Sequence, residues 1–495
     1  MDRYDVVIIG GGLGGLACGT ILSKEGMSVL LLERHRVIGG CLQSFRRGAY
    51  TLDTGMHYVG SLSEGQIMHQ YFKYFGVLDS LRMQTLDENG FDVIDVEGRR
   101  YRHAMGYDRF FETLAADFPD EREGLKRYCG ILKGIGSMLS PEILRRGKIS
   151  DGGIEYMMMS AYDTIADCVK NPTLRKVLAG TNGLYGGNRE TTSLYEHGII
   201  NNSNIEGCRC FVGGSQQLAD AFVNEIRRNG GEVRTGAGVE HIHLEGDRAE
   251  YVELQDGERI YADNIISSLH PSLTLSLLEN NTVIKKAFFT RINSLPNSCG
   301  IFTTYLLMKP GSMPYAGSNL WCYRTDDVWT LEGDYKGCNI PYVLISFQPA
   351  GNGYSDVVTV LSPMPERFME PWRDTVTGHR GEEYEEFKRR YGAAAADFAC
   401  EYLPELRDRI AGIHTASPLT YRDFTGTPDG TAYGIVKDYH NPIVNHLSAR
   451  MKVSNLFITG QNLNVHGCLG TSISAAVTCS ELLGTEYLTK KIGNA

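Results

Sequence analysis

The chain has 495 residues, and its 49 Lys and Arg residues against 59 Asp and Glu residues give a formal net charge of −10. Hydrophobic residues make up 42% and charged residues 22%, which is typical of a globular protein and excludes disordered, collagenous and coiled-coil classes. The acidic balance argues against nucleic acid as a partner, because phosphate backbones need basic surfaces. The composition departs from the usual one in glycine, with 57 residues.

The cysteines and the uncharged stretches bear on metal binding and location. The twelve cysteines form no Cys-x-x-Cys pair, and the nearest two are Cys208 and Cys210, so we expect no metal site and reduced thiols. With no secretory signal visible, this predicts a cytoplasmic protein. Residues 6–23 and 453–480 lack charges but contain many glycines or polar residues, so we expect them to be buried in a globule. Peripheral contact with a membrane stays open.

The first predicted elements form one βαβ unit. A β-branched strand over residues 4–9 leads into a glycine turn, a helix over residues 16–26 and a second strand over residues 28–33. The turn reads Gly10-x-Gly12-x-Gly14-Gly15, in which glycine permits the sharp bend, the approach of a pyrophosphate and close helix packing. Glu33 ends the second strand, where it can accept from ribose hydroxyls. These features predict a dinucleotide site.

A second glycine motif follows this unit. Arg36 precedes the pair Gly39-Gly40, and Arg34 and Ser44 flank the motif. A nicotinamide enzyme would not need this segment, so it favours a larger dinucleotide; the alternative is a glycine loop that only turns the chain. No further glycine fingerprint for NAD(P)H is found, and transient electron delivery by NAD(P)H or a reduced redox protein stays open.

The rest of the chain returns to a sheet and ends at a second helix. Residues 76–204 are predicted to be helical and irregular, Ser215 to cap a helix that runs to Arg228, and residues 231–268 to form short strands. Strands are also expected over residues 301–307, 342–347 and 455–461, and charged helix over residues 380–402. The last strand leads into a helix beginning near residue 467, whose N-terminus favours anions. A cofactor with the length of FAD could reach from one helix N-terminus to the other.

Several motifs together resemble the flavin-dependent phytoene desaturase and retinol saturase group. They are the first glycine turn with Glu33, Arg36-x-x-Gly39-Gly40, Asp53-Thr54-Gly55-Met56-His57-Tyr58-Val59-Gly60, Gly213-Gly214-Ser215, Thr427-Pro428-Asp429-Gly430-Thr431-Ala432-Tyr433-Gly434 and Thr459-Gly460-Gln461-Asn462. The block containing His57 and Tyr58 is closer to retinol saturases than to carotene desaturases. The similarity covers essentially the whole chain and is strongest at its two ends.

The resemblance implies an α/β fold with a discontinuous Rossmann-type FAD-binding domain, like those of glutathione reductase and amine oxidases, and an inserted α+β substrate domain. The FAD domain would comprise residues 1–75, 205–275 and 421–495, and the substrate domain residues 76–204 and 276–420. Beyond the two glycine motifs, the positions matched to FAD binding are Val239, Gly460, Gln461, Gly470, Thr471 and Ser472. Gln461 stands where related flavoproteins often have an acid.

The implied reaction is hydride exchange between flavin N5 and a carbon of a lipophilic isoprenoid, retinoid or carotenoid. Saturation of a double bond also needs a proton donor, for which His57, Tyr58 and His466 are the candidates, while Tyr433 is expected to line the substrate channel. His57 could instead be a hydrogen-bonded core histidine. Two other functions stay open: a flavin amine oxidase, and a non-catalytic flavin- or lipid-binding protein. The sequence does not indicate an oligomeric state.

Overall fold

The computed structural model describes residues 3–147, 153–331 and 337–495. Its first sheet has a parallel part in the order β10-β2-β1-β13-β20. These strands are β1 (Arg3–Ile9), β2 (Val29–Glu33), β10 (Glu232–Thr235), β13 (Arg259–Ser267) and β20 (Leu456–Ile458). The β-branched and leucine side chains of β1, β2, β13 and β20 are buried on both faces of the sheet, as in other parallel sheets covered by helices, whereas the edge strand β10 is partly exposed.

An antiparallel meander extends this sheet on one side. It comprises β11 (Val239–Glu245), β12 (Arg248–Leu254) and the first half of β13, and β14 (Leu278–Glu279) pairs with β11. The second half of β13 leaves β12 and pairs with β20, so β13 lies between the C-terminal strand and β1 from the start of the chain. The segments that follow β1, β2 and β20 therefore leave the same edge of the sheet.

Three helices cover the parallel strands. They are α1 (Leu13–Lys24), α10 (Gln216–Arg228) and α16 (Gly467–Leu483), and α1 packs against both of the others. Helix α2 (Ile67–Phe75) and helix α17 (Thr485–Gly493) lie outside them. Ser215 occupies the N-cap position of α10, but its hydroxyl does not cap the helix: it donates to the Leu42 carbonyl at 3.0 Å and so fixes the second glycine segment.

The second sheet has the order β19-β15-β18-β17-β16-β7-β8. Its strands are β7 (Asp92–Val96), β8 (Arg99–His103), β15 (Gly300–Met308), β16 (Asn319–Tyr323), β17 (Tyr342–Pro349), β18 (Ser355–Met364) and β19 (Ile410–Ala416). The long helix α13 (Glu382–Tyr402) packs on it. Strand β7 was not expected in a region predicted to be helical and irregular; it joins the sheet by parallel pairing with β16.

The remaining helices gather beside β7 and β8. The main ones are α3 (Tyr107–Asp117), α4 (Arg122–Ser137), α7 (Ala161–Cys168), α8 (Pro172–Ala179) and α9 (Leu194–Glu206). Shorter elements are β3 (Ser44–Arg47), β4 (Tyr50–Asp53), β5 (Val59–Gly60), β6 (Met83–Thr85), β9 (Cys208–Phe211), α5 (Pro141–Arg145), α6 (Ile154–Met157), α11 (Pro271–Ser276), α12 (Lys286–Asn293), α14 (Pro418–Thr425) and α15 (Pro442–Asn445). Helix α9 is buried along nearly its whole length and packs against α4.

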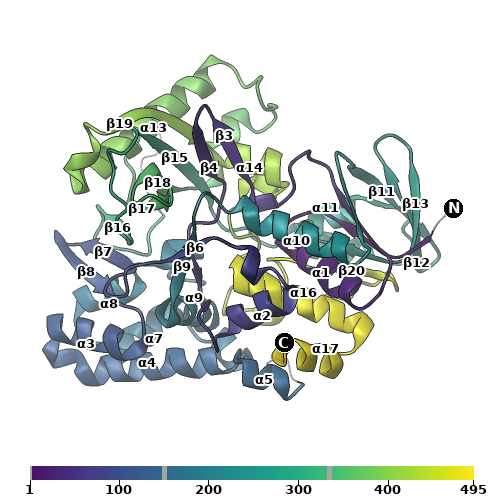
Figure 1. Ribbon diagram of the computed structural model, residues 1–495, viewed down its shortest axis with the longest axis horizontal. Helices are drawn as coiled ribbons and strands as arrows, with labels where there is room; N and C mark the ends of the chain where they lie inside the picture. The colour runs from purple at the N-terminus through teal and green to yellow at the C-terminus, as the bar shows by residue number, and fades with distance from the viewer. Residues whose placement is uncertain (1–2, 148–152, 332–336) are drawn as a thin grey trace.

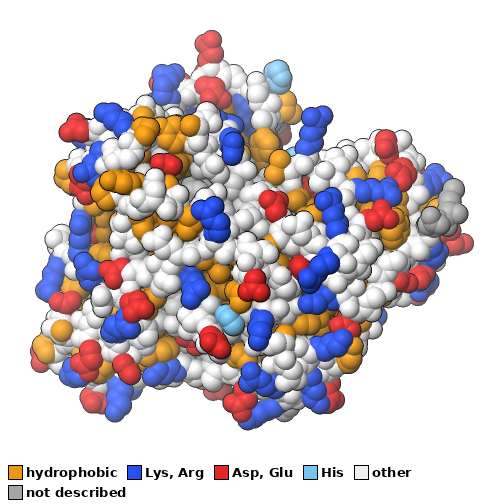
Figure 2. Space-filling view, viewed as in Figure 1, with side chains coloured by type: hydrophobic (Ala, Val, Ile, Leu, Met, Phe, Trp, Pro, Cys, Tyr) orange, Lys and Arg blue, Asp and Glu red, His pale blue; other side chains and the backbone are white. Residues whose placement is uncertain are grey.

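Figure 1 shows the two sheets at different ends of the molecule, with α16 between the meander of β11–β13 and the second sheet with α13. The parallel sheet with its covering helices confirms the Rossmann-type α/β fold, whereas the domain boundaries stay predictions. In Figure 2, acidic and basic side chains are interspersed over the visible face. Within the described ranges, none of the helices combines the length and apolar character needed to cross a bilayer.

Candidate FAD and substrate site

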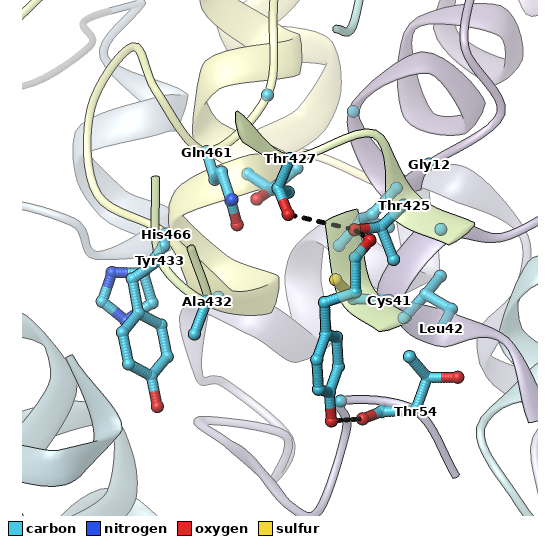
Figure 3. A pocket seen from close by; sticks show the side chains of 18 of the residues that line it. Gly12, Cys41, Leu42, Thr54, Thr425, Thr427, Ala432, Tyr433, Gln461 and His466 are labelled. Carbon is cyan, nitrogen blue, oxygen red and sulfur yellow. Dashed lines mark hydrogen bonds between the residues drawn. The ribbon is translucent and has the colours of Figure 1, made fainter. Parts of the chain in front are cut away.

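A cavity of about 520 Å³ lies between the two sheets and is lined by residues far apart in the chain. Its walls come from the turn before α1, from the second glycine segment, from the second sheet and from the start of α16. Figure 3 shows Tyr433, His466 and Gln461 on one side, with Cys41 and Leu42 facing them. Both ends of the chain thus build one site.

The glycines of the turn before α1 have different structural roles. Gly10 has φ +97°, a conformation that favours glycine, and a Cβ on Gly15 would lie 2.1 Å from the Gly10 carbonyl oxygen. A Cβ on Gly14 would lie 2.9 Å from the Cα of Gly460. A Cβ on Gly12 would meet nothing within 4 Å, because Gly12 faces the cavity. Gly10, Gly12 and Gly14 line the cavity, and Gly15 supports the turn from behind.

Glu33 holds the loops around the adenosine end of the site. One of its carboxylate oxygens accepts from the Gly11 backbone N–H and the other from that of His35, each at 2.8 Å. The side chain is buried and lines the cavity together with Val239. Each carboxylate oxygen has a lone pair left for a ribose hydroxyl, as the sequence motif predicts.

The second glycine segment lies against the first. Gly39 donates its backbone N–H to the Gly11 carbonyl at 2.9 Å, and a Cβ on Gly40 would lie 3.2 Å from the Cα of Gly12. Three flanking residues are placed differently. Arg34 lines the cavity and donates to the Asp423 carbonyl at 2.9 Å, whereas Arg36 is exposed and does not line it. Ser44 also lies outside the lining, where it donates to Asp53 at 2.6 Å.

The C-terminal wall is built by the strand β20 and the helix α16. Gly460, Gln461, Gly470 and Thr471 all line the cavity, and the helix begins at Gly467, before Thr471. A Cβ on Gly470 would lie 2.1 Å from the Val465 carbonyl oxygen, so glycine is required there for packing. Ser472 is buried outside the lining and donates to the Cys468 carbonyl at 2.8 Å.

These residues fit FAD. The N-termini of α1 and α16 open on the same cavity, and each helix terminus presents backbone N–H groups and a partial positive charge to it. Gly12 leaves open space where a pyrophosphate would approach the backbone, and Glu33 stands at the adenosine end. The cavity continues past these segments towards the second sheet, which gives room for a ring system and a substrate.

Two of the proton-donor candidates are neighbours in the chain and differ in their surroundings. His57 lines the cavity, and burial lowers the pKa of its ring to about 4, so the imidazole is neutral at physiological pH. Tyr58 also lines the cavity, and its hydroxyl donates to Asp92 at 2.9 Å. Burial and the nearby Asp92 carboxylate raise the pKa of Tyr58 well above its usual value.

His466 and Tyr433 stand together in the cavity wall. Their ring centroids are 4.5 Å apart, and both side chains line the cavity. His466 is the N-cap residue of α16; its Nε2 donates to the Leu184 carbonyl at 2.9 Å, and its Nδ1 lies 3.5 Å from Glu196. The Tyr433 hydroxyl donates to the Gly183 carbonyl at 2.6 Å. The structure therefore brings all four candidate side chains to one cavity, while their roles stay predictions.

Other lining residues were not identified from the sequence. Trp321 on β16 lines the cavity, and a Cβ on Gly183 would lie 2.6 Å from its ring. In the sequence, Gly183, Gly186 and Gly187 cluster near this wall. Asp92 lies just behind the wall and had no signal, because its partners are distant in the sequence.

Comparisons with known proteins agree with this site. Residues 13–296, more than half of the chain, match the family described as flavin containing amine oxidoreductase. The chain is 25% identical to the all-trans-retinol 13,14-reductase of Homo sapiens over 97% of this chain and 86% of that protein. It is 22% identical to the chloroplastic prolycopene isomerase of Daucus carota over 87% of this chain and 72% of that protein.

Solved structures give the same fold. A triple mutant of putrescine oxidase superposes with a TM-score of 0.65 at 14% identity, over 97% of this chain and 99% of that one. The family match, the glycine turn with Glu33 and the two helix termini identify FAD as the cofactor. This chain is therefore an FAD-dependent oxidoreductase that belongs to the flavin containing amine oxidoreductase family.

Proposed function

We propose that this protein saturates a carbon–carbon double bond of a lipophilic isoprenoid substrate of the retinoid or carotenoid class. The observation that carries the proposal is the continuity of the cavity from the cofactor segments to an apolar wall. This wall is formed by Ile199, Ile200, Ile301, Leu344 and Leu361. Similarity to all-trans-retinol 13,14-reductases over nearly the whole chain supports the substrate class and the reductive direction. Desaturation is the reverse of the same chemistry.

The cofactor, the apolar wall and the aromatic side chains would have different roles in this reaction. Bound FAD, once reduced by the electron donor, would supply a hydride from its N5 atom. The apolar wall holds a long hydrocarbon and excludes water from it. The aromatic side chains of Tyr58, Trp321 and Tyr433 would position the substrate, and a hydroxyl or imidazole on the wall would provide the proton.

Amine oxidation is the second candidate, since the family name and the structural neighbours include amine oxidases. An ammonium group is best held by a carboxylate or an aromatic cage. Among the described residues that line the cavity, Glu33 is the only carboxylate, and it is bound to the backbone at the adenosine end. The described lining of the cavity thus offers an ammonium group aromatic rings but no free carboxylate, and the preference for a neutral lipophilic substrate rests on the similarity to retinol reductases.

The proposal also covers partners and location. Electrons would come from NAD(P)H or a reduced redox protein that binds transiently. We propose a cytoplasmic protein, supported by the absence of disulfides among its twelve cysteines, all of which lie in described ranges. Peripheral membrane contact is supported by exposed Ile154, Met158 and Ile443, the last of which is 79% exposed. No nucleic acid partner is proposed, given the acidic net charge.

The test uses the flavin spectrum of the purified protein. The anaerobically reduced enzyme should be reoxidised by all-trans-retinol or a carotene, with a product two hydrogens heavier by mass spectrometry. Reduction of the oxidised enzyme by putrescine or cyclohexylamine would instead establish an amine oxidase. If neither a polyene nor an amine exchanges electrons with the flavin, the protein is a non-catalytic flavin or lipid binder and the proposal fails.

A further inference from the structure

A carboxyl group with no charged partner lies directly behind the cavity wall. Asp92 begins β7, is 0% exposed and does not itself line the cavity. The Tyr58 hydroxyl donates to its Oδ2 at 2.9 Å, and the Trp321 Nε1–H donates to its Oδ1 at 3.2 Å. Both donors line the cavity. One acid is therefore joined to the site through two side chains of the wall.

Nothing charged compensates this acid. Within residues 3–147, 153–331 and 337–495, no side-chain nitrogen of Lys, Arg or His lies within 4.0 Å of the Asp92 carboxylate oxygens. His103, which pairs with Asp92 on the neighbouring strand, is neutral because burial lowers its pKa to about 4. Burial raises its pKa to about 7, even though the bonds from Tyr58 and Trp321 act in the opposite direction. Asp95, on the same strand, instead pairs with Arg100 at 3.0 Å.

The hydrogen bond between Tyr58 and Asp92 can run in either direction. When Asp92 is ionised, the tyrosine hydroxyl donates to it, as the structure has it. When Asp92 is protonated, its own O–H can donate to the Tyr58 oxygen, which frees the tyrosine proton to point into the cavity. The oxygen–oxygen distance of 2.9 Å suits both arrangements.

We propose that Asp92 is a positioning residue that stores the proton which Tyr58 delivers to the substrate. The inference rests on the proposed function. Hydride arriving at one carbon of the double bond leaves an electron pair on the other carbon. That pair forms a C–H bond with the Tyr58 proton, and the electrons of the broken O–H bond stay on the tyrosine oxygen. The Asp92 proton then moves to this oxygen, and the carboxylate takes a new proton from water.

The first experiment measures the protonation of Asp92 itself and needs no substrate. Infrared difference spectra of the FAD-loaded enzyme, recorded as the pH is raised from 5 to 9, should show a carboxylic acid signal that disappears near pH 7, with a tyrosine signal that changes at the same pH. Asp92→Asn should lack both changes, and Tyr58→Phe should lack the tyrosine change. Asp95→Asn is the matched control on the same strand and should keep both.

The second experiment measures the rate of the reaction as a function of pH. With all-trans-retinol as acceptor, the rate of reoxidation of the reduced enzyme should fall as the pH rises through 7. Asp92→Asn should be slower by roughly 100-fold at pH 6 and should lose this pH dependence. Trp321→Phe should move the fall to higher pH, because the Trp321 bond favours the ionised form of Asp92. Asp95→Asn should resemble the wild type.

The outcomes separate the two proposals. A wild-type pH profile in Asp92→Asn, or an infrared titration that survives this substitution, would overturn the role of Asp92. If the wild-type enzyme accepts no polyene, the proposed function fails, and the infrared titration alone decides whether Asp92 and Tyr58 share a titrating proton. A loss of thermal stability in Asp92→Asn with the pH profile intact would assign Asp92 a structural role only.

Discussion

At the residue scale, Gly12 and Gly15 show the same residue type used for opposite reasons. Gly15 has no room for a Cβ because the Gly10 carbonyl lies in its place, whereas Gly12 has open space and φ −74°, which any residue can adopt. Gly15 is therefore required by the fold and Gly12 by the cofactor. Asp92 is a third case. Its burial costs stability, and its hydrogen-bond donors Tyr58 and Trp321 both belong to the cavity wall.

The two glycines give a matched pair of variants. Gly15→Ala should lower the free energy of unfolding of the apoprotein by roughly 1–3 kcal/mol through overpacking. Gly12→Ala should leave it within about 0.5 kcal/mol, while its methyl group should weaken FAD binding by about tenfold or more. Urea unfolding of the apoproteins and FAD titration check this. Equal loss of apoprotein stability in both variants would contradict the assignment of separate roles.

Asp92→Asn should stabilise the protein at alkaline pH. The folded-state pKa of about 7 lies above the usual value of about 3.9, so the folded state binds more protons between these pH values and its stability falls as the pH rises through this window. The variant escapes this loss, and above pH 7 it should be more stable than the wild type by about 1–3 kcal/mol. Urea unfolding at pH 5 and 8.5 provides the measurement; an equal difference at both pH values would show that Asp92 does not titrate in the fold.

At the element scale, helix α9 is held in the interior by polar side chains as well as apolar ones. Both ring nitrogens of His197 are hydrogen-bonded: Nε2 lies 2.9 Å from the Tyr128 hydroxyl, and Nδ1 lies 2.8 Å from the Tyr185 hydroxyl. Burial lowers the pKa of His197 to about 3, so the ring is neutral and must gain a proton when α9 is exposed at acid pH. The helix that carries Ile199 and Ile200 to the cavity therefore depends on a neutral histidine.

This arrangement predicts an acid-sensitive helix. The unfolded chain binds a proton at His197 below about pH 6.5 and the folded one does not, so stability is lost as the pH falls, by up to about 2 kcal/mol at pH 5. His197→Gln cannot titrate, so its loss of stability between pH 7 and 5 should be smaller by up to this amount. Tyr128→Phe keeps the histidine and should keep the wild-type slope. An unchanged slope in His197→Gln would argue against the neutral ring.

At the scale of the whole molecule, the cavity joins both sheets and both ends of the chain. FAD bound there contacts α1 at one end and α16 at the other, so its binding free energy should stabilise the molecule as one unit. The parallel strands covered by these helices give the cofactor a rigid support, and the second sheet supplies the wall for the proposed substrate.

Ligands of different length test this connection. FAD at about 100 times its Kd should stabilise the folded state by about 2.7 kcal/mol. Because the unfolding entropy of a chain of this size is large, this should raise the Tm by only about 2–3 °C. ADP, which reaches only the α1 end, should raise it less at equal concentration. Gly12→Ala should diminish both shifts. A shift from ADP equal to that from FAD would mean that α16 contributes nothing to binding.

How much could be predicted from the sequence depends on the distance between interacting residues. The turn from Gly10 to Gly15, the strands around it and the place of Glu33 at the end of β2 were predicted correctly, because one βαβ unit contains its own signals in about thirty residues. The contact of Glu33 with a ribose stays a prediction. Strand β7 was missed although it forms a local hairpin with β8, whereas its place in the second sheet is set by β16, more than two hundred residues away in the chain. The contact between Tyr58 and Asp92 is likewise set by this sheet and has no local pattern.

The pairing of β20 with β13 has a consequence for folding during synthesis on the ribosome. The α1 turn is synthesised first, but α16, which packs against α1 and closes the same cavity, follows about 450 residues later. At about 5–20 residues per second this interval is roughly 20–90 s. Throughout it, the apolar side of α1 around Cys18 has no α16 to cover it, and the nascent chain cannot yet retain FAD. Protection by a chaperone during this interval would therefore govern how much of the protein reaches its loaded form.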